Sequence, residues 1–253
     1  MNPGDNPQVD TSSRSGIVTG ASSGIGVAVA AALREEGFAL TVVGRDPAKL
    51  GRVAAELAAQ PGPPVQALAG SLADEAFLDH IVDQHSATFG ALDILVNNAG
   101  ISGHRNVEDI TAEFLDQQLA VNLRAVILLT AKSLPLLKDA VVQRNSAQVV
   151  NTSSNAGRRG EATLASYSAT KAGVVGFTEA LHDELAVAGI RATAICPGVV
   201  DTPMAQGYGI AADEMIAPAD VAEVVRMTTR LSAACIVPEI VLLRPSEWLQ
   251  TPQ

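Results

Sequence analysis

Residues that build metal centres and disulfide frameworks are scarce in this sequence. Only 2 cysteines and 4 histidines occur among 253 residues, and their spacing is not typical of metal ligands. His80 and His85 lie on different faces of an expected helix, so we expect surface or half-buried histidines and no metal. Cys196 and Cys235 lie in apolar segments, which predicts small buried side chains instead of a disulfide.

Long apolar runs and an excess of positive charge are missing as well. No apolar stretch reaches the roughly 18 residues of a membrane span, and the first residues lack the basic-then-apolar pattern of a signal peptide. The formal net charge of −10 disfavours nucleic acid and anionic membranes as partners. We therefore expect a cytoplasmic protein.

Most of the sequence alternates between short apolar runs and longer helical patterns, which predicts an α/β fold. We expect strands near residues 15–19, 39–43, 65–69, 92–96, 147–152, 190–196 and 236–243, and helices near 24–36, 47–59, 74–88, 111–138, 164–187 and 218–231. Apolar and polar residues do not alternate strictly along these strands, which predicts a parallel sheet with helices on both faces. Residues 1–13 are rich in Asn, Pro, Asp and Ser, which predicts a flexible tail. Residues 14–253 contain no repeats and no interdomain linker, so we expect them to form one domain.

A glycine-rich turn lies between the first expected strand and the first expected helix. Gly20 permits a tight turn, Gly24 allows the backbone to approach a pyrophosphate, and Gly26 allows the helix to pack on the strand. Free amides at the helix start would face the anion. The spacing Gly-x-x-x-Gly-x-Gly differs from the generic dinucleotide fingerprint, so a turn without a ligand is the alternative.

Tyr167 and Lys171 are separated by one helical turn, so their side chains share a face. A phenol of pKa near 10 is a poor proton shuttle at neutral pH, and a nearby ammonium would lower that pKa. Ser154 would hold the oxygen that gains or loses the proton. The trio predicts acid–base machinery for carbonyl–alcohol chemistry, whereas the pentapeptide 167–171 alone also fits a packed tyrosine and a solvated lysine.

Five segments, in this order, resemble the motifs of the short-chain dehydrogenase/reductase family over residues 14–244. They are residues 19–26, residues 97–100, Asn122, the trio Ser154, Tyr167 and Lys171, and Pro197-Gly198 followed by Thr202. The resemblance implies a single-domain Rossmann fold with a seven-stranded parallel sheet in the order 3-2-1-4-5-6-7. It also implies an NAD(P)-dependent dehydrogenase or reductase with the catalytic residues Asn122, Ser154, Tyr167 and Lys171.

The resemblance further implies a set of residues that contact the dinucleotide cofactor. They are Gly20, Ser22, Ser23, Gly24, Ile25, Gly26, Arg45, Ser71, Leu72, Asn98, Ala99, Gly100, Tyr167, Lys171, Pro197, Gly198, Val200 and Thr202. Relatives usually place an Asp where this sequence has Gly70-Ser71-Leu72, so adenine contact would pass through the Ser71 side chain and the Leu72 backbone.

The end of the second strand bears on the choice between NADP(H) and NAD(H). Arg45 would pair with a ribose 2′-phosphate, whereas an acidic residue there would bind the 2′-hydroxyl of NAD. Asp46 follows at once, but Asp46-Pro47 has the pattern of a helix cap. We expect NADP(H), with NAD(H) as the alternative.

The resemblance also implies a role for each catalytic residue. Tyr167 would protonate the substrate oxygen, and Ser154 would donate a hydrogen bond to it. Lys171 would lower the Tyr167 pKa and hold the nicotinamide ribose. Asn122 would anchor a water that relays protons to Lys171, and its alternative is a mid-helix Asn bonded to backbone. Thr202 would hold the carboxamide.

The substrate is the least defined part of the prediction. The short segment between Pro197 and Pro218 favours a small or extended substrate. Candidate lining residues are His104, Asn155, Glu161, Val199, Met204 and Tyr208. Residues 238–245 resemble the endings of short-chain enzymes that act on 3-hydroxy acids, serine-type substrates and small aldehydes.

We therefore predict hydride transfer between NADP(H) and a small carbonyl or secondary alcohol. A 3-oxoacyl-thioester reductase is the alternative enzyme, and a regulator that senses NADP(H) without turning it over is the alternative outside catalysis. The segments 111–138 and 164–187 carry apolar residues on more than one face, and the resemblance implies that they pair across a two-fold axis. We expect a homodimer or homotetramer.

Overall fold

The computed structural model describes residues 13–249. The predicted tail at residues 1–12 therefore lies outside the described residues, as do residues 250–253. The strands are β1 (Ser15–Thr19), β2 (Ala39–Gly44), β3 (Val65–Ala69), β4 (Ile94–Asn97), β5 (Ala147–Thr152), β6 (Ile190–Pro197) and β7 (Glu239–Leu242). The α-helices are α1 (Gly24–Glu35), α2 (Pro47–Ala59), α3 (Glu75–Phe89), α4 (Ala112–Leu119), α5 (Ala125–Arg144), α6 (Asn155–Arg158), α7 (Ala165–Leu185), α8 (Pro218–Arg230) and α9 (Pro245–Leu249).

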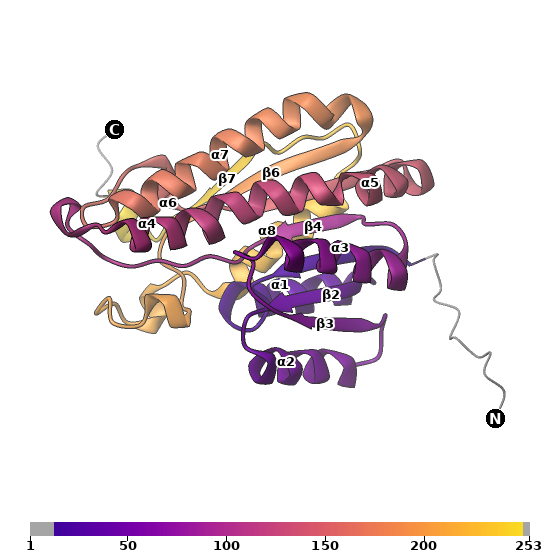
Figure 1. Cartoon of the computed structure of the whole chain (residues 1–253), viewed down its shortest axis with the longest axis horizontal. Helices are drawn as coiled ribbons and strands as arrows, with labels where there is room; N and C mark the ends of the chain where they lie inside the picture. The colour runs from indigo at the N-terminus through magenta and orange to yellow at the C-terminus, as the bar shows by residue number, and fades with distance from the viewer. Residues whose placement is uncertain (1–12, 250–253) are drawn as a thin grey trace.

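All strand pairs are parallel, and the sheet order is β3-β2-β1-β4-β5-β6-β7, as predicted. Figure 1 shows the order by colour, with the indigo and purple strands in the lower half and the orange and yellow strands in the upper half. The chain crosses between the two halves from β3 through α3 to β4. The carboxyl ends of β1 and β4 therefore lie beside each other, where a ligand crevice is expected in such sheets.

Helices cover both faces of the sheet. Neighbouring residues of one strand point to opposite faces, and because both sets are apolar, each face packs against helices. Val18 and Val42 join a core with buried side chains of α1, α2 and α8. Their neighbours Ile17 and Val43 join a second core with α3, α5 and α7. The apolar strands predicted from the sequence are therefore buried on both sides.

The predicted helix 111–138 is the largest difference between expectation and structure. It is divided into α4, a π-helical segment η2 (Ala120–Arg124) and α5, which continues to Arg144. The buried Ala140 extends the packed face of α5, and Asn145, with φ 60°, ends the helix. The strand predicted at 236–243 is reduced to the four residues of β7, and the short helices α6 and α9 were not predicted.

Two expectations about histidine and cysteine were wrong. His85 is fully buried, where its Nδ1 contacts Thr41 Oγ1 at 2.8 Å and its Nε2 contacts Ser15 Oγ at 3.1 Å. Burial lowers its pKa to about 4, which keeps the ring neutral. Cys196 is buried as expected, but Cys235 is only half-buried. Within residues 13–249, no helix is long and apolar enough to cross a bilayer, and no three potential metal ligands gather.

Candidate active site

The glycine-rich turn has the geometry that its sequence predicts. Gly20 and Gly24 adopt φ values of +69° and +54°, which residues other than glycine rarely adopt. A Cβ on Gly26 would overlap the Gly20 carbonyl oxygen, so only glycine allows α1 to start this close to β1. The side chain of Ser23 does not cap α1, and the first turn carries no acidic residue. The helix start therefore suits an anion.

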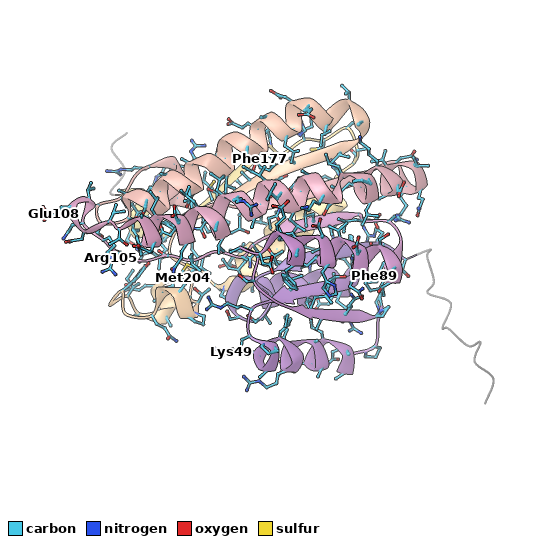
Figure 2. All side chains as sticks on the ribbon, in the orientation of Figure 1. Lys49, Phe89, Arg105, Glu108, Phe177 and Met204 are labelled. Carbon is cyan, nitrogen blue, oxygen red and sulfur yellow. The ribbon has the colours of Figure 1, made fainter. Side chains whose placement is uncertain are left out.

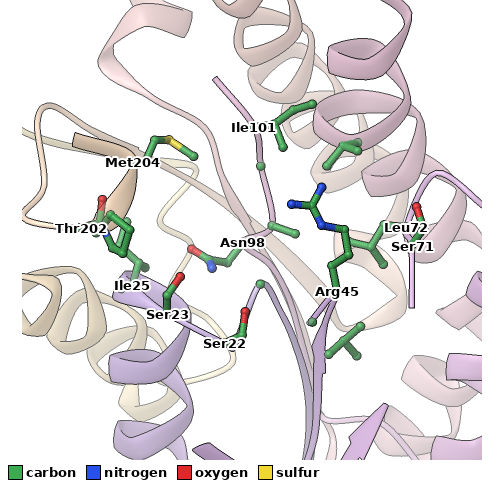
Figure 3. Close-up of a pocket in the computed structure, with 18 of the residues that line it drawn as sticks. Ser22, Ser23, Ile25, Arg45, Ser71, Leu72, Asn98, Ile101, Thr202 and Met204 are labelled. Carbon is green, nitrogen blue, oxygen red and sulfur yellow. The ribbon is translucent and has the colours of Figure 1, made fainter. Parts of the chain in front are cut away.

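A cavity of about 320 Å³ opens above this turn. It is lined by Gly20, Ser22, Ser23, Gly24, Ile25, Val43, Gly44, Arg45, Gly70, Ser71, Leu72, Asn98, Ala99, Gly100, Ile101, Val121, Thr202, Pro203 and Met204. We call it the coenzyme cavity. Figure 3 shows Arg45 and Asn98 pointing into it from the ends of β2 and β4. Of the predicted cofactor residues in and around the loop, only Gly26 does not line the cavity, because it sits beneath the turn.

Arg45 and Asp46 are neighbours in the sequence, but their side chains have different surroundings. Asp46 Oδ1 accepts hydrogen bonds from the amides of Ala48 and Lys49, both at 3.0 Å, and so caps α2. Arg45 is exposed, and its guanidinium makes no hydrogen bond or ion pair with any residue in 13–249. The guanidinium is thus available to an anionic group in the coenzyme cavity, whereas Asp46 is committed to the helix.

The segment after β4 is tied to β1 by a residue that the sequence analysis did not single out. Thr19 Oγ1 accepts hydrogen bonds from the amides of Asn98 at 3.0 Å and Ala99 at 3.1 Å. Asn98 Nδ2 also donates to the Thr19 carbonyl at 3.1 Å. On the far side of the cavity, Ser71 Oγ accepts from the Ala73 amide at 3.3 Å. The position of Thr19 in the glycine motif was the only sequence signal for its role.

A second cavity of about 130 Å³ adjoins the first, and we call it the catalytic cavity. Ile25, Asn98, Gly100, Thr202 and Met204 line both. The other lining residues are Ser102, Thr152, Ser153, Ser154, Ala156, Glu161, Leu164, Tyr167, Lys171, Pro197, Gly198, Val199, Val200, Ala205, Tyr208 and Glu247.

The structure brings three of the four predicted catalytic residues into this second cavity. Ser154 caps the start of α6 and accepts a hydrogen bond from the Ala156 amide at 3.1 Å. Tyr167 and Lys171 lie on α7, where both are buried. Four of the six candidate substrate-lining residues also reach the cavity: Glu161, Val199, Met204 and Tyr208. Asn155 does not line it, and His104 contacts it only through the ring of Tyr208, at a centroid distance of 5.4 Å.

The fourth residue, Asn122, lies in the π-helical segment and is fully buried. Its Oδ1 accepts from the Ile101 amide at 2.8 Å, and its Nδ2 donates to the Ile101 carbonyl at 2.8 Å and to Thr170 Oγ1 at 3.2 Å. A Cβ on Gly100 would lie 3.5 Å from Asn122 Oδ1 and 3.4 Å from Lys171 Nζ. Asn122 thus holds the segment after β4 against α7, close to the lysine.

The pKa of Tyr167 is shifted in the direction opposite to the expected one. Burial raises the pKa of Tyr167 to about 12, while the hydrogen bond from Ser154 acts in the opposite direction. Burial lowers the pKa of Lys171 to about 8. Lys171 Nζ donates to the Thr152 carbonyl at 2.8 Å and lies 5.8 Å from the centre of the Tyr167 ring. The prediction that Lys171 lowers the Tyr167 pKa is therefore wrong for this arrangement, in which burial dominates.

The segment after β6 closes over the junction of the two cavities. Pro197, Gly198 and Val200 line the catalytic cavity. Thr202 lies against the glycine-rich turn, since a Cβ on Gly24 would come 2.7 Å from Thr202 Cγ2. The short helices η4 (Pro203–Ala205) and η5 (Ala212–Glu214) follow.

Glu247 is a site residue that the sequence analysis missed. It lies on α9, yet its carboxylate accepts a hydrogen bond from the Val199 amide at 3.2 Å and lines the catalytic cavity. No motif signals it, because the contact depends on how the C-terminal segment returns to β6.

The family model described as short chain dehydrogenase matches residues 15–212. A monensin polyketide synthase putative ketoacyl reductase of Streptomyces virginiae is 37% identical over 207 residues, which cover 80% of this chain and 78% of that protein.

Two solved structures are similar over nearly the whole chain. An alcohol dehydrogenase from Thermococcus sibiricus, complexed with 5-hydroxy-NADP, has a TM-score of 0.84 and 26% identity, covering 95% of this chain and 99% of that one. A 3-ketoacyl-(acyl-carrier-protein) reductase from Brucella melitensis, complexed with NADH, has a TM-score of 0.83 and 33% identity, covering 91% and 96%.

Proposed function

Because the chain belongs to the short-chain dehydrogenase family, we propose that it transfers hydride between NADP(H) and a small carbonyl compound or secondary alcohol. The substrate is of the 3-hydroxy acid, aldehyde or ketone type. One observation carries the proposal: Ser154, Tyr167 and Lys171 line a cavity that shares a wall with the cavity above the glycine-rich turn.

The coenzyme cavity fits NADP(H) through its backbone and one side chain. The amides at the start of α1 suit the pyrophosphate, and the positive φ values of Gly20 and Gly24 allow close approach. The Arg45 guanidinium binds the 2′-phosphate. Several similar solved structures contain NADP, NADPH or an NADP derivative, and one contains NADH. The exposed Arg45 guanidinium favours the same choice of NADP(H). When bound, the nicotinamide gives or takes the hydride.

Tyr167 handles the proton. With a pKa of about 12 the phenol keeps its proton at neutral pH, so it is ready to donate to a carbonyl oxygen during reduction. Ser154 holds the same oxygen as negative charge develops on it. Lys171, with a pKa near 8, lies close enough to Asn122 and Gly100 to receive protons through a water held there.

The test is NADPH and NADH oxidation with a panel of ketones, aldehydes, 3-oxo acids and a 3-oxoacyl thioester. We expect turnover of small ketones or aldehydes, with NADPH preferred. A preference for the thioester would instead favour the 3-oxoacyl reductase, for which the similar reductase structure is the supporting observation. Nucleotide binding without turnover of any compound would favour a sensor.

We also propose that the protein is cytoplasmic and forms a homodimer or homotetramer through α4–α5 and α7. Light scattering is expected to give at least twice the 26.0 kDa chain mass. A monomer at micromolar concentration would contradict this assembly.

A further inference from the structure

The catalytic cavity carries more negative than positive charge. Among the described residues that line it, Glu161 and Glu247 are acidic and only Lys171 is basic. The Lys171 ammonium is buried and donates to the Thr152 carbonyl at 2.8 Å. Within residues 13–249, no arginine or histidine lines this cavity to bind a substrate carboxylate.

The charge of Glu247 is already balanced by the protein. Its carboxylate accepts hydrogen bonds from the amides of Val199 at 3.2 Å and Arg244 at 2.9 Å. The Arg244 guanidinium lies 3.2 Å from the same carboxylate. A Cβ on Gly198 would overlap Glu247 Oε2, so the backbone approaches this carboxylate closely. Glu247 therefore holds the loop after β6 in place.

Glu161 differs from Glu247 in this respect. It lies in the loop between α6 and α7, where its backbone amide donates to Ser168 Oγ at 3.3 Å and its carbonyl accepts from the Leu164 amide at 3.1 Å. Its carboxylate makes no hydrogen bond or ion pair with any residue that the structure describes. Arg158, in the preceding helix α6, is paired with Glu239 instead. The backbone is thus fixed while the carboxylate is left for another partner.

Glu161 is an exposed residue that lines the catalytic cavity, and its charge contributes to raising the pKa of Tyr167. Partial burial and the charge of Glu247 raise the pKa of Glu161, while His104 and Arg159 act in the opposite direction. Leu164, Met204 and Tyr208 supply the less polar part of the same cavity. Tyr167 and Glu161 line the same cavity of about 130 Å³, so a small substrate bound there would lie between the proton donor and the carboxylate.

We infer that Glu161 determines substrate specificity by charge. It favours carbonyl compounds that carry a cationic or hydrogen-bond-donating group, and it disfavours compounds that carry a free carboxylate. Two carboxylates in a partly desolvated cavity repel each other, whereas an ammonium or amide gives Glu161 the partner that the protein does not supply. The inference rests on the proposed function and narrows its substrate class, because it excludes free 3-oxo acids as preferred substrates.

Two pairs of ketones of matched shape test the charge effect. The first pair is 3-oxobutanoate and 3-oxobutanamide, which differ by one negative charge. The second pair is (2-oxopropyl)trimethylammonium and 4,4-dimethylpentan-2-one, which differ by one positive charge. Steady-state kcat/KM is measured for each with saturating NADPH at pH 7. Wild type is expected to prefer 3-oxobutanamide over 3-oxobutanoate, and the ammonium ketone over its neutral partner, by at least tenfold each.

Three variants separate Glu161 from general charge effects. Glu161→Gln keeps the shape and is expected to bring both ratios within threefold of unity. Glu161→Lys is expected to invert the first ratio, so that 3-oxobutanoate becomes the better substrate. Glu108→Gln is the control, since it removes one negative charge from an exposed residue of the short 3-10 helix η1 (Val107–Asp109) that lines neither cavity. Figure 2 shows Glu108 at the outer edge of the molecule. Glu108→Gln is expected to keep the wild-type ratios.

The outcomes distinguish the inference from the proposed function. Turnover of the neutral ketones with ratios that Glu161→Gln leaves unchanged would overturn the inference while the proposed function stands. A wild-type preference for 3-oxobutanoate would also overturn it. Failure of wild type to reduce any compound of this set or of the broader panel would overturn the proposed function, and the inference with it.

Discussion

The coenzyme cavity and the catalytic cavity share lining residues, but the first is formed mainly by backbone and the second mainly by side chains. The coenzyme cavity depends on backbone, with the glycine-rich turn, the start of α1 and the ends of β2 and β4 around it. The catalytic cavity depends on side chains from α7, α9 and the loops after β4, β5 and β6. The glycine-rich turn at residues 19–26 therefore predicts much of the coenzyme cavity from one short segment, whereas no single segment predicts the catalytic cavity.

The difference is also one of charge. The Arg45 guanidinium in the coenzyme cavity and the Glu161 carboxylate in the catalytic cavity make no hydrogen bond or ion pair with residues 13–249. The two charges lie in adjoining cavities, so they can select an anionic coenzyme and a cationic or neutral substrate separately. Substitutions that affect only one of these functions test this separation.

The largest expected effect comes from Tyr167→Phe. The variant removes the proton donor and keeps the packing of a residue that is buried. Turnover is expected to fall by roughly 10²–10⁴, the usual contribution of general acid–base catalysis. NADPH affinity, measured by fluorescence titration, is expected to stay within a few-fold of wild type. Tyr208→Phe, the same change at the only other tyrosine, is the control and should cost far less. Turnover close to wild type in Tyr167→Phe would show that another residue supplies the proton.

Gly26→Ala is expected to disturb the coenzyme cavity from below. The new Cβ would overlap the Gly20 carbonyl, and this backbone contact cannot move aside. The expected cost is about 3 kcal/mol in the free energy of unfolding, together with weaker NADPH binding.

The matched control is Gly51→Ala on α2, where a Cβ would meet nothing within 4 Å. It is expected to stabilise the fold by roughly 0.5–1 kcal/mol because alanine favours the helix. Thermal or denaturant unfolding of both variants measures the contrast. Equal stability of the two would contradict the close packing of α1 on β1.

Arg45→Asp is expected to change only the choice of coenzyme. The charge-assisted hydrogen bond that is lost is worth about 1.5–3 kcal/mol, and the added repulsion enlarges the effect. The ratio of kcat/KM for NADPH to that for NADH is therefore expected to fall by well over tenfold, with kcat nearly unchanged. Arg52→Asp makes the same change at an exposed position outside both cavities and should leave the ratio within twofold. Wild-type preference for NADH would contradict the proposed role of Arg45.

The glycine-rich turn and the cap at Asp46 could be predicted because each depends on neighbouring residues, whereas the order of the strands came from the family resemblance. The sequence predicted one helix over 111–138, and the π-helical segment at Asn122 could not be predicted because its geometry depends on hydrogen bonds to Ile101 and Thr170. The raised pKa of Tyr167 and the burial of His85 were missed, because desolvation depends on what packs around a side chain.

The sequence by itself determined the fold class, the turn suited to a dinucleotide and the residue types of the acid–base trio. Local spacing sets these features, through glycine conformations, one helical turn between Tyr167 and Lys171, and apolar strands. Only the tertiary structure decided that Glu161 and Glu247 line one cavity and that Glu247 binds the Val199 amide. Glu161, Val199 and Glu247 belong to segments far apart in the chain, and their distances are set only after folding.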